Sequence, residues 1–376
     1  MKYDNERISD ISLFFLLSAA ITEVGVLEMP RLFAESVGRD LWLVPLLMIP
    51  VLLLSLYLFC LLGKRFPDET VFEYGPRLLG RPLAQVLFAV LIAYWFLVTG
   101  RMMRDFADVV RLTLLSLTPA EVIIGSMLVS ATYLVRKGLE PISRAATIII
   151  LITVPIGLGI TMLTYIKTSP VMNMRPVLAH GPWKVLKEGV RGVGLVEQLS
   201  AFFVFFPFLS KPEKAWRTAA ISVVITILLF ANVTFSTLAV FGPVELVHVR
   251  LPALSAVQTV EQPFIFIESL SSFYVATWIA QMFITIAFML WLIATGIQKW
   301  LGHRDHIGLA TPALPIIYLI SLSPANVAAL DKLIRIQENC GVFIHLILPL
   351  ILLIAVRRRR KPEQTNKQQG REDGDS

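Results

Sequence analysis

The sequence has little of the material that builds metal centres and disulfide frameworks. Among 376 residues it contains only two cysteines, Cys60 and Cys340, and five histidines. The two cysteines give neither a metal-ligand spacing nor a framework of several disulfides. The histidines are scattered, and none repeats with the four-residue spacing by which one face of a helix holds a metal. We therefore expect no metal site and no functional role for cysteine.

Motifs of catalysis are missing as well. The chain has no phosphate-binding loop, no nucleophile elbow and no zinc-binding helix motif. The string GVGLVE, residues 192–197, lacks the strand–turn–helix context that a dinucleotide site needs. We therefore expect a protein that is not an enzyme, with no catalytic residues and no cofactor.

Charged residues are also scarce, and apolar residues take their place. Only 16% of the chain is charged and 56% is hydrophobic, which is more apolar surface than a soluble domain buries. The apolar residues form blocks long enough to cross a bilayer, which takes roughly 20 helical residues. The sequence therefore predicts an all-α integral membrane protein of about ten transmembrane helices. We place the spans near 10–36, 41–63, 84–110, 119–136, 142–166, 186–210, 216–241, 269–299, 308–322 and 341–356.

The net charge of +7 raises the question of a nucleic-acid partner, which the placement of the basic residues answers. With a cytoplasmic N-terminus, basic residues concentrate in the segments that stay inside and end in the run Arg357–Arg360. This is the positive-inside pattern, and with an even number of spans it puts both termini in the cytoplasm. We expect a lipid bilayer around the chain and no nucleic-acid partner. We divide the chain into one transmembrane domain, residues 1–356, and a basic and then disordered cytoplasmic tail, residues 357–376.

Polar residues and helix breakers interrupt the first predicted span at mid-depth. Thr22, Glu23 and Gly25 stand there, followed by Glu28 and Pro30. Glycine lowers helix stability, proline removes a backbone donor, and a carboxylate at this depth is costly unless it faces protein or water. A broken helix exposes backbone groups at the midplane, where many secondary transporters hold a small polar ligand. A packing glycine with a proline kink is the alternative, but it leaves Glu23 unexplained.

The sixth predicted span also contains residues that are unusual in lipid, namely Gly192, Gly194, Glu197, Gln198, Ser200 and Pro207. Broken helices at the first and sixth positions are typical of a transporter core made of two five-helix halves. We therefore expect a five-plus-five inverted-repeat, permease-like core with broken first and sixth helices. The two glycines fit close helix packing equally well, and both interpretations stay open at this point.

Charged residues near the end of the third predicted span stand one helical turn apart. Arg101 and Asp105 are four residues apart, as are Arg104 and Asp108, so each pair shares a helix face. We interpret them as structural ion pairs, because pairing explains charges at this depth better than a gate or a carboxylate-binding site does.

Several strings resemble, in order, those of one family. They are GVLEMP (25–30), FEYGPRLLG (72–80), LTPAEVII (117–124), GLEPISR (138–144), NMRPVLAHG (173–181) and LPALSAVQTVEQPFIFIES (251–269). A tryptophan, Trp42, opens the second span, and the eighth is led by tryptophan too. On these strings the chain resembles the B subunit of GerA-type spore germinant receptors. These are spore germination permeases of the amino acid–polyamine–organocation superfamily.

The resemblance implies a role in nutrient sensing in the inner membrane of the spore. It implies a small-molecule germinant, an amino acid or an amine, and two partners, a membrane-anchored A subunit and a lipoprotein C subunit. A ligand would then bias one arrangement of a transporter-like bundle. The implied ligand-binding residues are Thr22, Glu23, Val24, Gly25, Val26, Tyr94, Val98, Glu197, Gln198, Leu199, Ser200, Ala201, Gln281 and Thr285.

Two departures from the family lie in this implied pocket. The family often has glycine where this chain has Glu23, and glutamate where it has Ala201, with Glu197 one turn earlier. A carboxylate at Glu23 suits an amine or cationic germinant, or it pairs within the bundle. Interhelical hydrogen bonding explains Gln281 and Thr285 as well as ligand contact does.

The sequence leaves two functions open. The first is a germinant-binding subunit that senses without transporting, which the family strings favour. The second is a proton- or cation-coupled amino-acid transporter of the same fold, in which an intramembrane acid such as Glu23 or Glu197 is the coupling site.

Overall fold

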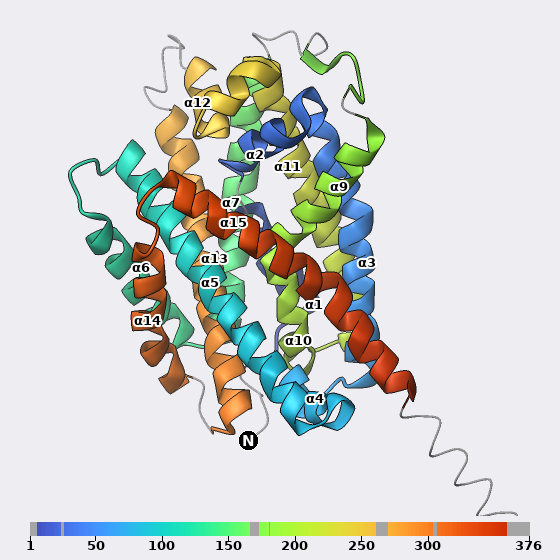
Figure 1. Ribbon diagram of the computed structural model, residues 1–376. Coiled ribbons are helices and arrows are strands. Elements are labelled where there is room, and N and C mark those ends of the chain that lie inside the picture. The colour runs from blue at the N-terminus through green and yellow to red at the C-terminus, as the bar shows by residue number, and fades with distance from the viewer. Residues whose placement is uncertain are drawn as a thin grey trace, which may run out of the picture.

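Helices make up almost all of the regular structure in the computed structural model of the chain (Figure 1). The structure describes residues 6–23, 26–165, 173–179, 181–260, 270–303 and 307–358. Within these ranges, one isolated bridge pairs Ile8 with Leu209. Helices dominate because a bilayer offers no hydrogen-bond partners, so each backbone amide and carbonyl must be satisfied within its own segment.

The apolar blocks of the sequence fold into helices at the predicted places. The principal helices are α1 (Asp10–Glu23), α2 (Met29–Val37), α3 (Leu43–Arg65), α5 (Arg81–Thr113), α6 (Ala120–Val135), α7 (Leu139–Thr164), α9 (Pro182–Gly192), α11 (Ala215–Glu245), α13 (Leu270–Leu301), α14 (Ile307–Leu322) and α15 (Val327–Val342). Short helices and turns connect them: η1 (Gly38–Trp42), α4 (Val71–Leu79), η3 (Val193–Leu195), η4 (Glu197–Ala201), α10 (Phe202–Phe205), η5 (Phe206–Phe208), η6 (Pro212–Lys214), η7 (Leu246–His248), α12 (Pro252–Val260) and the π-turn η8 (Phe343–Ile347).

Six helical stretches of the described chain are long and apolar enough to cross a membrane. They are Met29–Arg65, Arg81–Thr113, Leu139–Thr164, Pro212–His248, Leu270–Leu301 and Ala328–Arg358. A bent pair of helices adds a seventh candidate, and three shorter apolar helices are Asp10–Thr22, Ala120–Val135 and Gly308–Leu322. The chain is therefore a multi-pass membrane protein, whereas the count of ten spans and the inverted repeat stay predictions.

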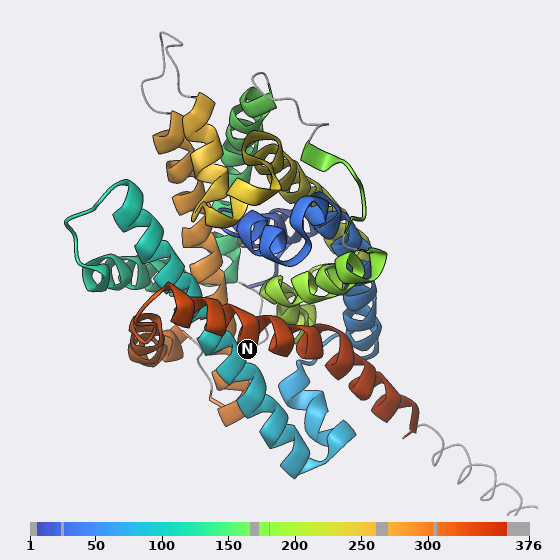
Figure 2. The ribbon, with the colours of Figure 1, turned by 45° about the horizontal axis from the view of Figure 1, so that its top comes forward.

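Helix α13 lies in the middle of the bundle. In an apolar stretch of 18 residues within α13, 83% of the residues are buried in the protein. The corresponding share is 28% in α7 and 33% in Ala328–Arg358. Helix α13 packs against α1, α5, α6, α7 and α14. By contrast, α15 crosses the outside of the bundle in both views (Figures 1 and 2). In Figure 1, α2 and α12 lie at the upper end of the bundle and α4 at the lower end.

The first predicted span is interrupted, as the sequence indicates. Helix α1 ends at Glu23 and α2 begins at Met29, with a turn over 26–28. Pro30 stands in the first turn of α2 and so does not kink a helix, which was the alternative interpretation. In the first turn a backbone N–H has no intrahelical acceptor, so its absence in proline costs no hydrogen bond. The proline thus helps to start the second half of the broken span.

The sixth predicted span is interrupted too. The stretches Pro182–Leu195 and Glu197–Phe208 meet at an angle of 53°. Val196 lies between them with φ −92° and ψ 62°, outside the helical region. Two breaks therefore exist, and both fall within a few residues of the predicted positions.

The last predicted span begins too late in the sequence-based assignment. The prediction starts it near residue 341, but the helix runs from Ala328 to Arg358. The part missing from the prediction contains three polar residues, Asp331, Gln337 and Glu338. All three hydrogen-bond or pair with side chains of other segments.

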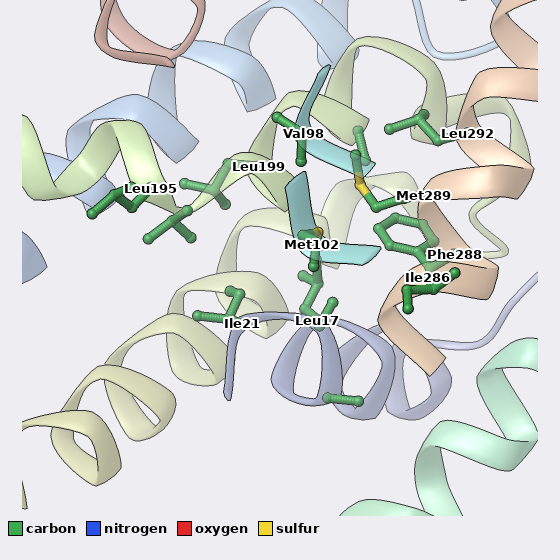
Figure 3. Packing of buried hydrophobic residues seen from close by; sticks show 14 of the residues in the cluster. Leu17, Ile21, Val98, Met102, Leu195, Leu199, Ile286, Phe288, Met289 and Leu292 are labelled. Carbon is green, nitrogen blue, oxygen red and sulfur yellow. The ribbon is translucent and has the colours of Figure 1, made fainter. Parts of the chain in front are cut away.

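Hydrophobic side chains from four segments fill the interior between the two breaks. Figure 3 shows Leu17 of α1, Met102 of α5, Leu195 of η3 and Phe288 of α13 in this cluster. All four are at most 2% exposed. Burial of this kind holds α1, α5 and α13 together at the depth where α1 and the sixth span are interrupted.

Candidate functional site

A hollow lies beside the break in the first span. Helices α1, α7, α11 and α13 bound it, and its empty volume is about 560 Å³ including the open mouth. Thr22 precedes the break, Val26 follows it, and both side chains line the hollow. The interrupted helix therefore forms part of the wall of this hollow.

Hydrogen bonds between helices form the polar part of its wall. Gln281 of α13 donates from Nε2 to Thr153 Oγ1 of α7 at 2.6 Å. Asn232 of α11 donates from Nδ2 to Thr161 Oγ1 of α7 at 3.0 Å. All four residues line the hollow. The bonds fix the side-chain amides in place, so the wall presents hydroxyl and amide groups in set orientations.

Aromatic residues and one unpaired hydroxyl complete the wall. Phe230, Tyr274 and Trp278 line it, and Trp278 stacks on Phe106 with ring centroids 6.1 Å apart. Thr226 also lines it, and its buried hydroxyl meets no hydrogen-bond partner in the described part of the protein. A buried hydroxyl without a partner is unfavourable. A ligand with a hydrogen-bonding group would relieve this.

Formal charge does not line the hollow as far as the described residues go. Glu23 ends α1 beside Thr22, but its side chain lies outside the described part of the structure. Val24 and Gly25 lie outside the described residues altogether. The ligand contacts expected of these three residues therefore stay predictions.

Other predicted ligand contacts lie in the hydrophobic interior instead. Val98 and Leu199 belong to the buried cluster of Figure 3, and Ala201 is buried with them. Thr285 donates its hydroxyl to the backbone oxygen of Gln281 at 3.1 Å. None of the four is among the described residues that line the hollow. Thr285 thus bonds within its own helix, whereas Gln281 bridges to α7.

A second polar group of side chains surrounds the break in the sixth span. Arg101 Nη2 of α5 lies 3.1 Å from Glu197 Oε1 of η4, and Arg101 Nε donates to Gln337 Oε1 of α15 at 2.5 Å. Arg101 also pairs with Asp105, and Gln337 donates to Glu197. All four residues are at most 8% exposed. Buried charges persist only when paired and hydrogen-bonded, and this cluster supplies the partners from three segments.

Helix α15 packs directly on the sixth break. A Cβ atom on Gly194 would lie 2.0 Å from the backbone oxygen of Glu338, and one on Gly341 would lie 2.2 Å from the backbone oxygen of Gly194. Only glycine permits so close a backbone approach. Arg191 Nη2 also lies 3.1 Å from Glu338 Oε2. For Gly194, the structure therefore favours close packing, one of the two interpretations left open by the sequence.

The π-turn that follows α15 contributes another contact to this break. His345 Nδ1 lies 3.1 Å from the backbone oxygen of Val193, and Ser55 Oγ of α3 donates to the backbone oxygen of His345 at 2.8 Å. Neither His345 nor Gln337 could be predicted from the sequence. An isolated histidine gives no spacing signal, and Gln337 falls in the polar stretch left out of the last span.

The remaining predicted residues of the sixth span and of α5 are also buried. Gln198 is fully buried, and neither atom of its side-chain amide has a hydrogen-bond partner in the ranges described. Ser200 Oγ accepts from Trp95 Nε1 at 2.8 Å. Tyr94 Oη lies 3.4 Å from the backbone oxygen of Gly194. The structure thus gathers Tyr94 and residues 197–201 around the second break, apart from the hollow at the first.

The other charged pair of the third span joins a wider ion-pair chain. Arg104 Nε lies 3.2 Å from Asp108 Oδ2, and the same oxygen is 3.1 Å from Arg250 Nη2. Arg250 precedes α12, so this carboxylate links α5 to the segment before α12. The geometry fits a structural role for both pairs of α5.

Comparison with known proteins supports one family. The sequence model of the spore germination protein family matches residues 7–330. Spore germination protein YndE of Bacillus subtilis (strain 168) is 26% identical over 342 residues, covering 90% of this chain and 93% of that protein. Spore germination protein KB of the same strain is 25% identical over 376 residues, covering 97% of this chain and 98% of that protein.

A solved structure shows the same fold. The crystal structure of MhsT in complex with L-phenylalanine superposes with a TM-score of 0.59, covering 92% of this chain and 97% of that one. The two sequences are 14% identical, so the likeness concerns the fold alone. Because the family match covers most of its length, this chain belongs to the spore germination protein family.

Proposed function

We propose that this chain is the germinant-binding subunit of a spore germination receptor and that the germinant binds in the hollow beside the first break. The observation that carries the proposal is the position of this hollow. Its wall combines Thr22 and Val26, from either side of the break, with Gln281 of the central helix α13. A ligand there would contact a point at which the helix is already interrupted, so binding can shift the two halves relative to each other.

The chemistry of the wall suits an amino acid or a related amine. Phe230, Tyr274 and Trp278 would hold an apolar side chain, and Thr226 would accept or donate one hydrogen bond. Glu23 is the carboxylate nearest in sequence to the lining, and a cationic amine is its natural partner. MhsT, which shares the fold, was crystallised with the amino acid L-phenylalanine.

A ligand could contact the residues at the second break only after an opening motion. Tyr94, Val98 and residues 197–201 remain proposed ligand contacts, but they are packed against one another, α15 and α13 in this structure. A ligand would reach them only if α15 and the sixth span separated. We propose that this separation is the sensing step, which the receptor passes to an A subunit and a lipoprotein C subunit in the spore inner membrane, with both termini of this chain cytoplasmic.

A coupled amino-acid transporter is the second candidate, favoured by one observation. Glu197 is fully buried, and its Oε2 has no hydrogen-bond partner among the side chains and backbone described. Such a carboxylate can take up a proton or bind a cation in step with a substrate. Uptake of radiolabelled amino acid by vesicles that contain the purified chain would separate a transporter from a receptor.

The deciding experiment uses spores in which this chain belongs to the only nutrient receptor. We expect Gln281→Ala to raise the nutrient concentration for half-maximal germination by about fivefold, the equivalent of one hydrogen bond of about 1 kcal/mol. We expect Glu23→Gln to change which nutrients are recognised. The matched control is Gln85→Ala, because Gln85 accepts from Trp300 Nε1 at 2.5 Å, also between helices but away from the hollow.

Immunoblots of the spore membrane would establish equal protein levels in each case. A normal response of both pocket variants to every nutrient would place the germinant elsewhere. An equal loss in the Gln85 variant would mean that helix packing, and not ligand contact, sets the response.

A further inference from the structure

A second, basic hollow lies at the edge of the bundle, where three helices end. The C-terminal part of α5, the N-terminus of α6 and the C-terminus of α14 meet there, at the left of Figure 1 and again at the left of Figure 2. Its empty volume is about 850 Å³ including the open mouth. The residues that line it are Arg104, Arg111, Leu117, Thr118, Pro119, Ala120, Glu121 and Leu322.

Two guanidinium groups face this hollow from one helix. Arg104 and Arg111 stand seven residues apart on α5, which places them on the same face two turns apart. Arg104 lies 3.2 Å from Asp108, whereas Arg111 forms no ion pair with any residue that the structure describes. Glu121 is the single acidic residue among the described lining. The lining thus carries a net positive charge.

The N-terminus of α6 adds backbone donors to the same hollow. The backbone N–H groups of Val122 and Ile123 donate to the backbone oxygen of Pro119, which precedes the helix, at 3.2 and 3.4 Å. The amides of Ala120 and Glu121 precede them, in the part of a helix whose N–H groups have no intrahelical acceptor. Such amides, with the positive end of the helix dipole, favour an anion.

Apolar side chains surround this basic hollow. Leu117 lines it and is 97% exposed, and Leu115, two residues earlier in the same loop, is 48% exposed. Leucines so exposed in the loop before α6 are costly in water. In contact with acyl chains they cost nothing.

The depth of the hollow agrees with a position among lipid headgroups. The third predicted span covers residues 84–110, so Arg111 of α5 stands just past its end. Arg104 lies seven residues earlier, roughly 10 Å deeper along the helix. The ninth predicted span ends at Leu322, which also lines the hollow. Both span ends place the mouth of the hollow at the edge of the hydrocarbon core.

We propose that this hollow binds the phosphate group of an anionic phospholipid. Arg104, Arg111 and the first amides of α6 hold the phosphate, and Leu117 with its neighbours lies along the acyl chains. Free phosphate shares the headgroup chemistry, but it offers nothing to the exposed leucines, so the lipid is the occupant that matches the whole surface. This site is separate from the proposed germinant hollow, so neither proposal depends on the other.

The test measures lipid retained by the full-length chain in nanodiscs of phosphatidylcholine mixed with phosphatidylglycerol. Native mass spectrometry of the protein released from the nanodiscs then counts how many molecules of each lipid stay bound to it. We expect Arg111→Gln to lower the preference for phosphatidylglycerol about fivefold, the usual effect of one basic residue at a membrane surface. We expect Glu121→Gln to raise it. The matched control is Arg144→Gln, since Arg144 is 73% exposed and lies on α7, outside the lining.

Each outcome decides the proposal. Loss of preference in the Arg111 variant, a gain in the Glu121 variant and no change in the Arg144 variant support it. An equal loss in the Arg144 variant would mean unspecific surface attraction and overturn it. Displacement of phosphatidylglycerol by millimolar inorganic phosphate would show a site for a free anion and overturn the lipid assignment. If Arg111→Gln does not fold, an unchanged preference in the Glu121 variant suffices to refute the proposal.

Discussion

The two helix breaks resemble each other in sequence but have different surroundings. Both place glycine and a carboxylate within a few residues of the interruption, at Gly25 with Glu23 and at Gly194 with Glu197. The first break borders a hollow lined by hydroxyl, amide and aromatic side chains. The second is filled by α15, whose backbone approaches Gly194 closely.

The difference shows that a broken helix in a membrane has two uses. It exposes backbone groups that need partners, and either a ligand or a neighbouring helix can supply them. Where space remains, as at the first break, we propose that a small molecule supplies them. Where a helix fills the break, as at the second, its backbone lies directly against the interruption.

Removal of the cation at the second break should have the largest effect. Arg101→Leu leaves the buried carboxylates of Asp105 and Glu197 without their guanidinium partner, which should destabilise the protein by about 3–5 kcal/mol. Thermal unfolding of the purified chain in detergent measures this. Arg144→Leu is the control, because its partner Glu140 is surface-exposed and such pairs contribute little. Equal stability of both variants would disprove that the second break depends on this cluster.

A single methyl group at the second break should have the next largest effect. Gly194→Ala brings a Cβ to 2.0 Å from the backbone of Glu338, and relief requires α15 to move away, at about 1–3 kcal/mol. The same change at Gly125, in α6, meets nothing within 4 Å and should stabilise the helix by about 0.5–1 kcal/mol. If both substitutions shifted the unfolding temperature in the same direction, this would contradict the packing of α15 on the break.

The smallest effect on stability is expected at the first break. Thr226→Val removes a buried hydroxyl that has no partner in the described structure, so stability should stay the same or rise by about 1 kcal/mol. The germination response should weaken nevertheless, because a ligand loses a hydrogen-bond partner. Unfolding temperature and nutrient dose–response of the same variant test both halves. A clear loss of stability would show that this hydroxyl is part of the packing and not of a binding wall.

Much of the fold could be predicted because its solvent is the bilayer. Long uncharged blocks such as residues 84–100 have no alternative to helical spans. The interruption after Glu23 could be predicted as well, since glycine and a carboxylate are unfavourable within a lipid-embedded helix. The family strings supplied the rest of the functional hypothesis, and the match over residues 7–330 confirms the family.

The location of the hollow could not be predicted in the same way. The family resemblance implied a pocket among the first, third, sixth and eighth spans. Instead, Thr153 of α7 and Asn232 of α11 share the wall with Gln281, while Val98 and Leu199 pack in the core. Hydroxyl and amide side chains on apolar helices carry no spacing signal, so nothing in the sequence marked α7 and α11 as walls.

The sequence by itself determined the bilayer as surroundings, the helical spans and the two places where a helix is interrupted, because these depend on local composition and on the cost of polar groups in lipid. Only the tertiary structure decided which interruption stays open and which is filled. That choice depends on contacts between residues far apart in the chain, such as Gly194 with Gly341 and Arg101 with Gln337. Their fit is a matter of three-dimensional packing, which a local pattern does not encode.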